Sequence, residues 1–193
     1  MCAFLYPGEY LDSTYRIDFE QLYQDGYRGI IFDIDNTLVP HGAPADERAI
    51  LLFTRLKKLG FQCVLLSNNK EPRVKMFNDA VQVQYIYKAG KPKPAGYRRA
   101  MEIMGTNTEN TLFVGDQIFT DVCGANLAGI RTILVQPIHP KEEIQIVLKR
   151  YLEKVVLLCY RIHVKLFGAK YPSVRIKEDG LKRGNKDEDW NRK

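Results

Sequence analysis

Short apolar segments of strand length alternate with amphipathic segments of helical length between residues 29 and 135. The apolar segments are rich in Ile, Val, Leu and Phe, and polar turns separate them from the segments that follow. A regular strand–helix alternation of this spacing folds into right-handed βαβ units. We therefore expect an α/β fold in which one parallel sheet is sandwiched by helices. The predicted strands are residues 29–33, 61–66, 83–87, 111–114 and 132–135, and the helices between them are 46–59, 71–80, 94–105 and 119–128.

Outside this core, at residues 29–140, the pattern is simpler. Residues 1–28 are predicted to form an N-terminal arm that packs against the sheet and contains a short helix from 18 to 24. This interpretation is favoured over a tyrosine-based binding site. Residues 141–170 are predicted to form a basic amphipathic helix. Residues 171–193 are predicted to be a disordered tail, because the chain from Lys177 onward is charged and almost free of aliphatic residues.

The net charge of +6 is concentrated near the C-terminus. Residues 1–140 carry 15 basic and 15 acidic side chains, whereas residues 141–193 carry 14 and 8. A neutral core with a basic appendage indicates a surface-docking segment and argues against a nucleic-acid partner. The four cysteines are too widely spaced for a zinc site or a disulfide framework, and no signal peptide or membrane-spanning segment is predicted. We expect a cytosolic protein whose only membrane contact is peripheral, at the inner face.

Polar residues follow four of the predicted strands. Asp33 and Asp35 come at the end of the first strand, Ser67 follows the second, Lys91 the third and Asp116 the fourth. Because the carboxyl ends of parallel strands meet at one edge of a sheet, we expect these side chains to form a single site. Side chains two residues apart in a strand lie on the same face, so Asp33 and Asp35 would point toward one place if the strand continued through them.

These residue types fit the hydrolysis of phosphate monoesters, which is among the slowest reactions in water. Asp33 is the candidate nucleophile, and Asp35 is the candidate acid that protonates the leaving group and later activates water. Magnesium prefers oxygen ligands, and we expect Asp33, Asp116 and the carbonyl of Asp35 to bind Mg²⁺.

Further residues complete the expected site. Thr37, Ser67 and Asn68 are the candidate substrate-binding residues, at positions where hydroxyls and amides can bind phosphoryl oxygens. Lys91 is expected to offset the negative charge of the carboxylates and the substrate. Asp121 is expected to orient Lys91 or a metal-bound water from behind.

Each motif taken alone has an ordinary structural explanation, such as a turn, a helix cap or a surface linker. Their joint order after apolar strands favours a site, and it resembles the haloacid dehalogenase (HAD) superfamily of phosphatases. The resemblance rests on Asp33-Ile34-Asp35-Asn36-Thr37, on Ser67, on a lysine in Lys-Pro-x-Pro and on Gly115-Asp116 with Asp121. The spacing to the two prolines favours Lys91 over Lys93 as the site lysine. The resemblance implies a HAD-like Rossmannoid fold, an aspartyl-phosphate mechanism and Mg²⁺.

The arm and the Gly-Asp-Gln-x-x-Thr-Asp motif are similar to the class IIIA branch of YqeG and the phosphatidylglycerophosphate phosphatases. Only 29 residues separate Thr37 from Ser67 and 23 separate Ser67 from Lys91. These gaps are too short for the cap domains of many HAD relatives, so we expect a capless site that admits bulky substrates. A phospholipid headgroup is one candidate, and phosphoproteins and nucleic-acid ends are others. A low-turnover phosphate-dependent regulatory protein is also consistent with the motifs.

The helix predicted at 141–170 has apolar residues at helical spacing. Between Lys149 and Lys177 there are eight basic residues and one acid, Glu153. The pattern is consistent with contact to an anionic membrane and equally with packing on the core or on a second subunit. The stripe comprises Ile144, Leu148, Tyr151, Val155, Leu158, Ile162 and Leu166.

Overall fold

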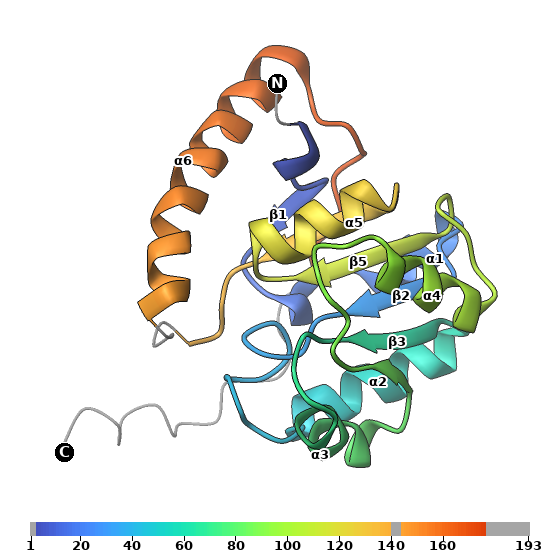
Figure 1. The fold of residues 1–193 in the computed structure, drawn as a ribbon. Coiled ribbons are helices and arrows are strands. Elements are labelled where there is room, and N and C mark those ends of the chain that lie inside the picture. Colours follow the sequence, from blue (N-terminus) through green and yellow to red (C-terminus); the bar gives the residue numbers. More distant parts are fainter. Residues whose placement is uncertain (1–2, 140–143, 177–193) are drawn as a thin grey trace.

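The computed structural model describes residues 3–139 and 144–176, with the side chains of the last helix described from Tyr151 onward. Six parallel strands form one sheet in the order β1-β6-β5-β2-β3-β4 (Figure 1). The predicted α/β fold with a parallel sheet is therefore confirmed. The strands are β1 (Glu9–Leu11), β2 (Gly29–Phe32), β3 (Gln62–Leu66), β4 (Gln84–Ile86), β5 (Thr111–Gly115) and β6 (Arg131–Val135).

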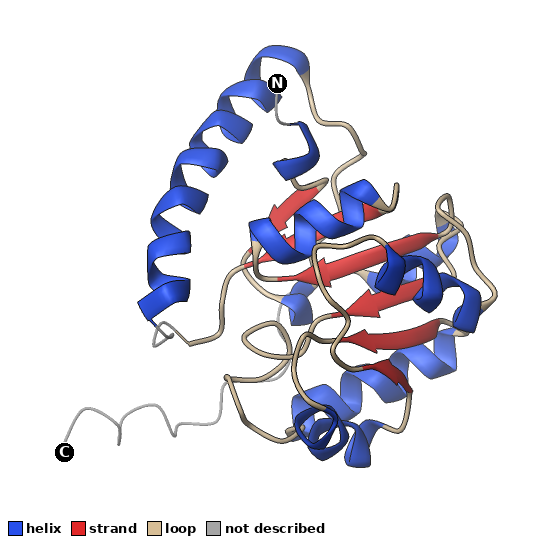
Figure 2. Ribbon diagram, viewed as in Figure 1, coloured by secondary structure: helices blue, strands red, loops and turns tan. Residues whose placement is uncertain are grey.

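Helices cover both faces of the sheet (Figure 2). Ile30 and Phe32 of β2 pack into one apolar layer, while Ile31 packs into the layer on the other face, as strand alternation requires. The first layer is covered by α1 (Phe19–Gln24), α2 (Glu47–Leu59) and α3 (Glu71–Val81), and the second by α4 (Ala95–Met104) and α5 (Cys123–Leu127).

The strand order reverses direction at β2. This strand pairs with β3 on one side and with β5 on the other, so the chain moves outward through β3 and β4 and then returns to β5. In open parallel sheets the carboxyl ends of two such strands leave a crevice between the connections, and ligands bind there. The fold therefore predicts a site just beyond the ends of β2 and β5.

The two gaps between the predicted motifs hold few elements. The stretch from β2 to β3 contains α2 as its one helix, and the stretch from β3 to Lys91 contains α3 and β4. Asp46 caps α2 by accepting a hydrogen bond from Ala49 N at 2.8 Å, and Gly60 ends it with a φ of 96°. The core is thus capless, as the gap lengths predict.

Two parts of the chain differ from the sequence-based expectation. The N-terminal arm contributes β1, a sixth strand that pairs with β6, whereas a packed arm outside the sheet was predicted. Residues 171–176, at the start of the predicted disordered tail, pack on the core: Val174 is buried, and Ile176 forms an antiparallel bridge with Ile17. The strand β1 was missed because three residues are too few to show an alternation of apolar and polar side chains. The prediction of disorder was wrong for residues 171–176 because it rested on the composition of the chain after residue 176. Residues 177–193 lie outside the described part.

The last helix, α6 (Ile144–Phe167), lies beside the core on the side to which the strands point (Figure 1). It falls within the predicted span of 141–170. Across residues 3–139 and 144–176, no helix has the length and hydropathy that crossing a membrane requires.

Candidate active site

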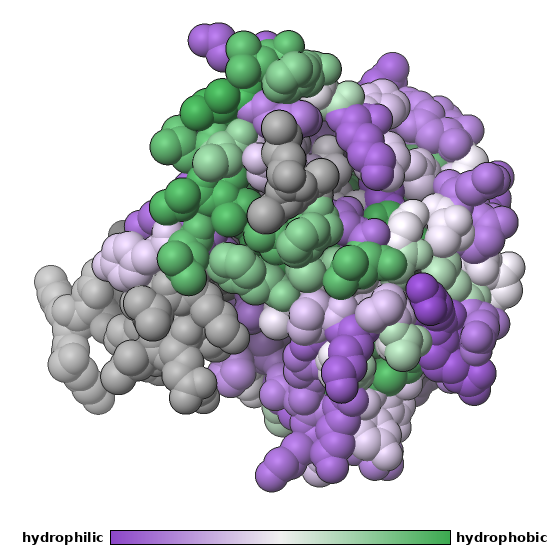
Figure 3. All heavy atoms as spheres, turned by 45° about the horizontal axis from the view of Figure 1, so that its top comes forward, coloured by the Kyte–Doolittle hydropathy of each residue, from purple (hydrophilic) through white to green (hydrophobic). Residues whose placement is uncertain are grey.

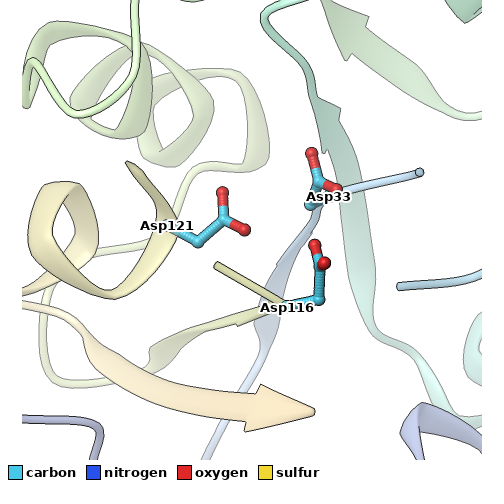
Figure 4. Close-up of side chains that lie close together, drawn as sticks. All are labelled: Asp33, Asp116 and Asp121. Atoms are coloured by element: carbon cyan, nitrogen blue, oxygen red, sulfur yellow. The ribbon is translucent and has the colours of Figure 1, made fainter. Parts of the chain in front are cut away.

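Three buried carboxylates meet at the carboxyl ends of β2 and β5. Asp33 directly follows β2, Asp116 directly follows β5, and Asp121 lies in the π-helical turn η3 (Ile118–Val122) (Figure 4). One oxygen from each lies within 4.8 Å of the others, and the residues are at most 7% exposed. Like charges this close and this buried require nearby positive charge. The place predicted from the strand order therefore holds a buried acidic cluster.

Lys91 supplies part of that positive charge. Its Nζ donates hydrogen bonds to Asp33 Oδ1 at 2.6 Å and to Asp121 Oδ1 at 2.7 Å. Burial disfavours the ammonium form, but Asp121 and Asp33 outweigh burial and raise the pKa of Lys91. Lys91 is therefore protonated at pH 7. Lys93, the alternative lysine, is exposed.

The protonation of Asp33 depends on the same contacts. Burial raises the pKa of Asp33, Lys91 lowers it, and the negative charges of Asp121 and Asp35 raise it further, with a net value of about 6. The ammonium of Lys91, 2.6 Å from Asp33 Oδ1, favours the carboxylate form of Asp33, which is the form that attacks an electrophile.

A tight turn returns the chain to the site after β2. Asn36 has a φ of 60°, a conformation that asparagine tolerates, and its N–H donates to Val39 O at 2.8 Å. The turn places Thr37 Oγ1 at 3.2 Å from Asp116 Oδ1 and 3.4 Å from Asp33 Oδ2. Thr37, a predicted substrate-binding residue, thus lies between two of the carboxylates.

The approach of Asp121 depends on a glycine. A Cβ at Gly115 would lie 2.6 Å from Asp121 Oδ2, closer than any side chain permits. Asp121 is further fixed by Gln117, whose N–H donates to Oδ2 at 3.1 Å. Because the other oxygen of Asp121 accepts from Lys91, its contacts match the predicted role of orienting the lysine. The close approach of the Asp121 carboxylate to those of Asp33 and Asp116 was not predicted.

The residues fit a hard divalent cation. Three carboxylates and one ammonium leave a net charge of about −2 in a buried crevice, and Mg²⁺ prefers oxygen ligands of this kind. Thr37 Oγ1 contacts both Asp33 and Asp116, whereas the two oxygens of Asp121 accept from Lys91 Nζ and Gln117 N, so Asp33 and Asp116 are the pair best placed to bind the ion. The predicted contribution from the carbonyl of Asp35 stays a prediction.

The carboxylate of Asp35 is not part of this cluster. Its Oδ1 accepts from Arg73 Nη2 and from Gly42 N, both at 2.8 Å, and its Oδ2 accepts from Asn69 Nδ2 at 2.6 Å. Strand periodicity suggested that both acids point to one place, but β2 ends at Phe32, so the two-residue repeat does not extend to Asp35. Arg73 and Asn69 were not predicted, because nothing in the sequence of α3 or of the turn before it marks a contact across the site.

Ser67 and Asn68 follow β3 as predicted, but their contacts differ. Ser67 is buried, and its Oγ accepts from Asn69 N at 3.1 Å. Asn68 bonds to the backbone of Lys91 in both directions: Lys91 N donates to Oδ1 at 2.8 Å, and Nδ2 donates to Lys91 O at 3.1 Å. The Asn68 side chain therefore positions the lysine loop.

The N-terminal arm supports the turn after β2. Thr14 Oγ1 donates to Thr37 O at 2.8 Å, and Tyr15 Oη donates to Leu38 O at 2.5 Å. Hydrogen bonds from side chains to a distant backbone leave no sequence pattern, so this support was not predicted. The arm thus helps to shape the site.

Comparisons with known proteins agree with this geometry. Residues 88–144 match a family model described as HAD-hydrolase-like. The chain is 37% identical over 155 residues to a Bacillus subtilis protein named "Probable phosphatase YqeG", and the match covers 80% of this chain and 90% of that protein. The chain belongs to the HAD phosphatase family of YqeG. The resemblance inferred from the motifs is thereby confirmed, and the protein is a HAD-type phosphatase.

Two eukaryotic proteins are more distant relatives of this HAD phosphatase. It is 28% identical over 178 residues to Arabidopsis thaliana phosphatidylglycerophosphate phosphatase 1, chloroplastic/mitochondrial, covering 78% of this chain and 49% of that protein. It is 29% identical over 150 residues to Chlamydomonas reinhardtii phosphatidylglycerophosphate phosphatase 1, chloroplastic, covering 72% and 55%. The chain therefore spans about half the length of these two relatives. Among solved structures, Escherichia coli NagD has a TM-score of 0.49 at 15% identity, covering 63% of this chain and 91% of NagD.

Proposed function

We propose that this HAD phosphatase hydrolyses phosphomonoesters with Mg²⁺, through a phosphoryl group attached covalently to Asp33. The observation that carries the proposal is the buried cluster of three carboxylates, two of which pair with the ammonium of Lys91. Asp33 and Asp116 would bind the ion, and bound Mg²⁺ supplies neutralisation of the charge between nucleophile and phosphate.

The proposed reaction has two displacements at phosphorus. An oxygen of Asp33 attacks, the bond from phosphorus to the ester oxygen breaks, and the leaving alkoxide takes a proton from Asp35. Water then attacks the same phosphorus and gives a proton to Asp35, and the bond to Asp33 breaks to release inorganic phosphate. In this proposal Lys91 fixes one oxygen of the nucleophile, while Thr37, Ser67 and backbone amides bind phosphoryl oxygens.

Asp35 has to exchange its contacts for this role. In the structure Arg73 and Asn69 donate hydrogen bonds to its two oxygens, so neither oxygen faces a leaving group without a change of partners. We expect the side chain to leave these partners when substrate binds.

The variant Asp35→Asn separates the two displacements. With an aryl phosphate, whose leaving group needs no proton, we expect a rapid burst of about one phenol per enzyme and then slow turnover, because activation of water is lost. With an alkyl phosphate we expect no burst. Rapid-quench measurement of both products checks this expectation. Asp79→Asn, at an exposed position of α3, is the matched control. Unchanged turnover of both esters by Asp35→Asn would remove Asp35 from the mechanism.

We further propose that the physiological substrate is a bulky phosphate, with phosphatidylglycerophosphate as the leading candidate. The core has no inserted cap between the site motifs, so a large leaving group can approach. The names of the two eukaryotic relatives support a lipid phosphate.

A panel of lipid, nucleotide, sugar and peptide phosphates, each assayed with and without Mg²⁺, tests this function. We expect Mg²⁺-dependent turnover, fastest on the lipid phosphate, and loss of activity when EDTA removes the metal. Faster turnover of phosphopeptides or nucleic-acid ends would overturn the lipid substrate but keep the phosphatase. Phosphate binding without turnover of any class would favour the regulatory alternative.

A further inference from the structure

The described part of α6 has two faces with different contacts. On the inner face, Val156 and Leu157 pack against a buried cluster formed by Ile118, Val122 and Leu134. Tyr160 and His163 of the same face contact the ring of Tyr6, with centroids 5.8 Å and 5.3 Å apart. The helix is therefore attached to the core along one side.

The outer face of α6 is apolar and exposed. The apolar side chains of this face project away from the core along the length of the helix, and each of them is between 51% and 72% exposed. Figure 3 shows the hydrophobic residues gathered along this side of the molecule. A continuous exposed apolar patch of this kind usually marks a site of interaction with a protein or a membrane. The outer apolar face comprises Tyr151, Leu152, Val155, Leu158, Ile162, Leu166 and Phe167.

Positive charge follows one edge of the outer apolar face. Lys154, Arg161 and Lys165 are spaced by seven and four residues, which places them in a row on the helix surface, and all three are exposed. Glu153, the one acid between Lys149 and Lys177, is buried, and its Oε1 accepts from Ile118 N at 2.6 Å. The exposed side of this segment thus combines apolar and cationic residues without an opposing acid.

We propose that the outer apolar face docks on an anionic lipid bilayer. An apolar stripe beside a row of Lys and Arg is typical of helices that lie in the membrane interface, with apolar side chains among the acyl chains and cations among the headgroups. A second copy of this chain fits less well, because it would bring a second row of cations to the interface. The inference stands on the surface of α6 and does not depend on the proposed phosphatase mechanism.

The inner face of α6 lies beside the candidate active site. A cleft of about 290 Å³ lies between the helix and the ends of β5 and β6, and both Leu157 of α6 and Asp116 line it. The hydrogen bond from Ile118 to Glu153 joins the helix to the turn that carries Asp121. Docking would therefore hold the acidic cluster on the other side of α6 from the membrane, with about one helix diameter, ~10–12 Å, between the bilayer and the cleft.

Co-sedimentation with vesicles tests the proposal in the full chain. We expect binding to vesicles of phosphatidylglycerol and phosphatidylcholine, and weaker binding to phosphatidylcholine alone. The variant Val155→Glu/Ile162→Glu should weaken binding by at least about 100-fold, because two side chains can no longer insert. The matched control is Leu51→Glu/Met76→Glu, which changes exposed apolar residues of α2 and α3 and should bind like the wild type. Hydrolysis of a soluble aryl phosphate should be unchanged in both variants and reports that each is folded.

Charge and self-association give the remaining outcomes. The variant Lys154→Gln/Arg161→Gln/Lys165→Gln should lose roughly 100-fold in affinity for the anionic vesicles and little for the neutral ones. Absence of vesicle binding by the wild type would overturn the proposal. So would a dimer, measured by sedimentation velocity, that dissociates in Val155→Glu/Ile162→Glu, because a second copy would then cover the face.

Discussion

Replacing Asp33 with asparagine is expected to lower turnover of an aryl phosphate by at least about 10⁴-fold. The amide is a poor nucleophile, and two of the neighbouring carboxylates are held by other partners, Asp35 by Arg73 and Asp121 by Lys91. The fold should persist, because Lys91 remains paired with Asp121 at 2.7 Å. Steady-state kinetics at saturating Mg²⁺ measure the loss, and thermal unfolding measures the stability.

The control for this loss is the same chemical change at a distant position. Asp79→Asn should retain full activity, since Asp79 lies exposed on α3. If Asp33→Asn retained more than about a tenth of the wild-type turnover, Asp33 could not be the nucleophile.

Replacing Lys91 with methionine is expected to affect both stability and activity. Nζ of Lys91 lies 2.6 Å from Asp33 and 2.7 Å from Asp121, so the substitution leaves these two buried carboxylates, which lie close to Asp116, without their ammonium. Removing one partner of a buried ion pair typically costs about 3–5 kcal/mol in the free energy of unfolding. Turnover should fall as well, because the charge that offsets nucleophile and phosphate is lost.

The pH dependence of this variant follows from Asp33. Its folded-state pKa is already about 6 with Lys91 present, above the ordinary value of 3.8, and removing the lysine raises it further. The folded state then binds more protons than the unfolded state between these two pKa values, so stability increases as the pH falls through the raised pKa. The difference from wild type should therefore be smaller at pH 5 than at pH 8. Added Mg²⁺ should also reduce the difference in stability, because a cation binds more tightly to carboxylates that have lost their neighbouring ammonium and so stabilises the variant more than the wild type.

Lys93→Met is the matched control for Lys91→Met, because it removes the neighbouring but exposed lysine. It should unfold and turn over like the wild type in urea denaturation and in the aryl phosphate assay. If Lys93→Met lost activity while Lys91→Met kept it, Lys93 and not Lys91 would be the site lysine.

The convergence of Asp33, Lys91 and Asp116 could be predicted because it depends on topology. Asp33, Ser67, Lys91 and Asp116 each follow an apolar strand, and parallel strands bring their carboxyl ends together whatever the details of the loops. The same reasoning could not give the direction of a side chain beyond the end of a strand. Asp35 shows this limit, since it lies past β2 and contacts Arg73.

Long-range contacts account for most of the remaining differences. β1 joins the sheet through its register with β6, and Glu9 in that strand accepts from Val174 N at 2.8 Å, near the other end of the described chain. Neither contact has a local sequence pattern. For α6, helical spacing predicted an apolar stripe, but the spacing alone could not tell which side packs on the core. Tyr151, Val155 and Leu158 of the predicted stripe lie on the exposed side.

The most direct test of the mechanism is to locate the phosphoryl group during turnover. Asp35→Asn is mixed with an aryl phosphate and Mg²⁺, quenched in acid within the burst, digested and analysed by mass spectrometry. We predict one phosphoryl group on the peptide that contains Asp33, at that residue, and none when Asp33→Asn is combined with Asp35→Asn. Release of phenol in the burst without a phosphorylated Asp33 would contradict the proposed mechanism.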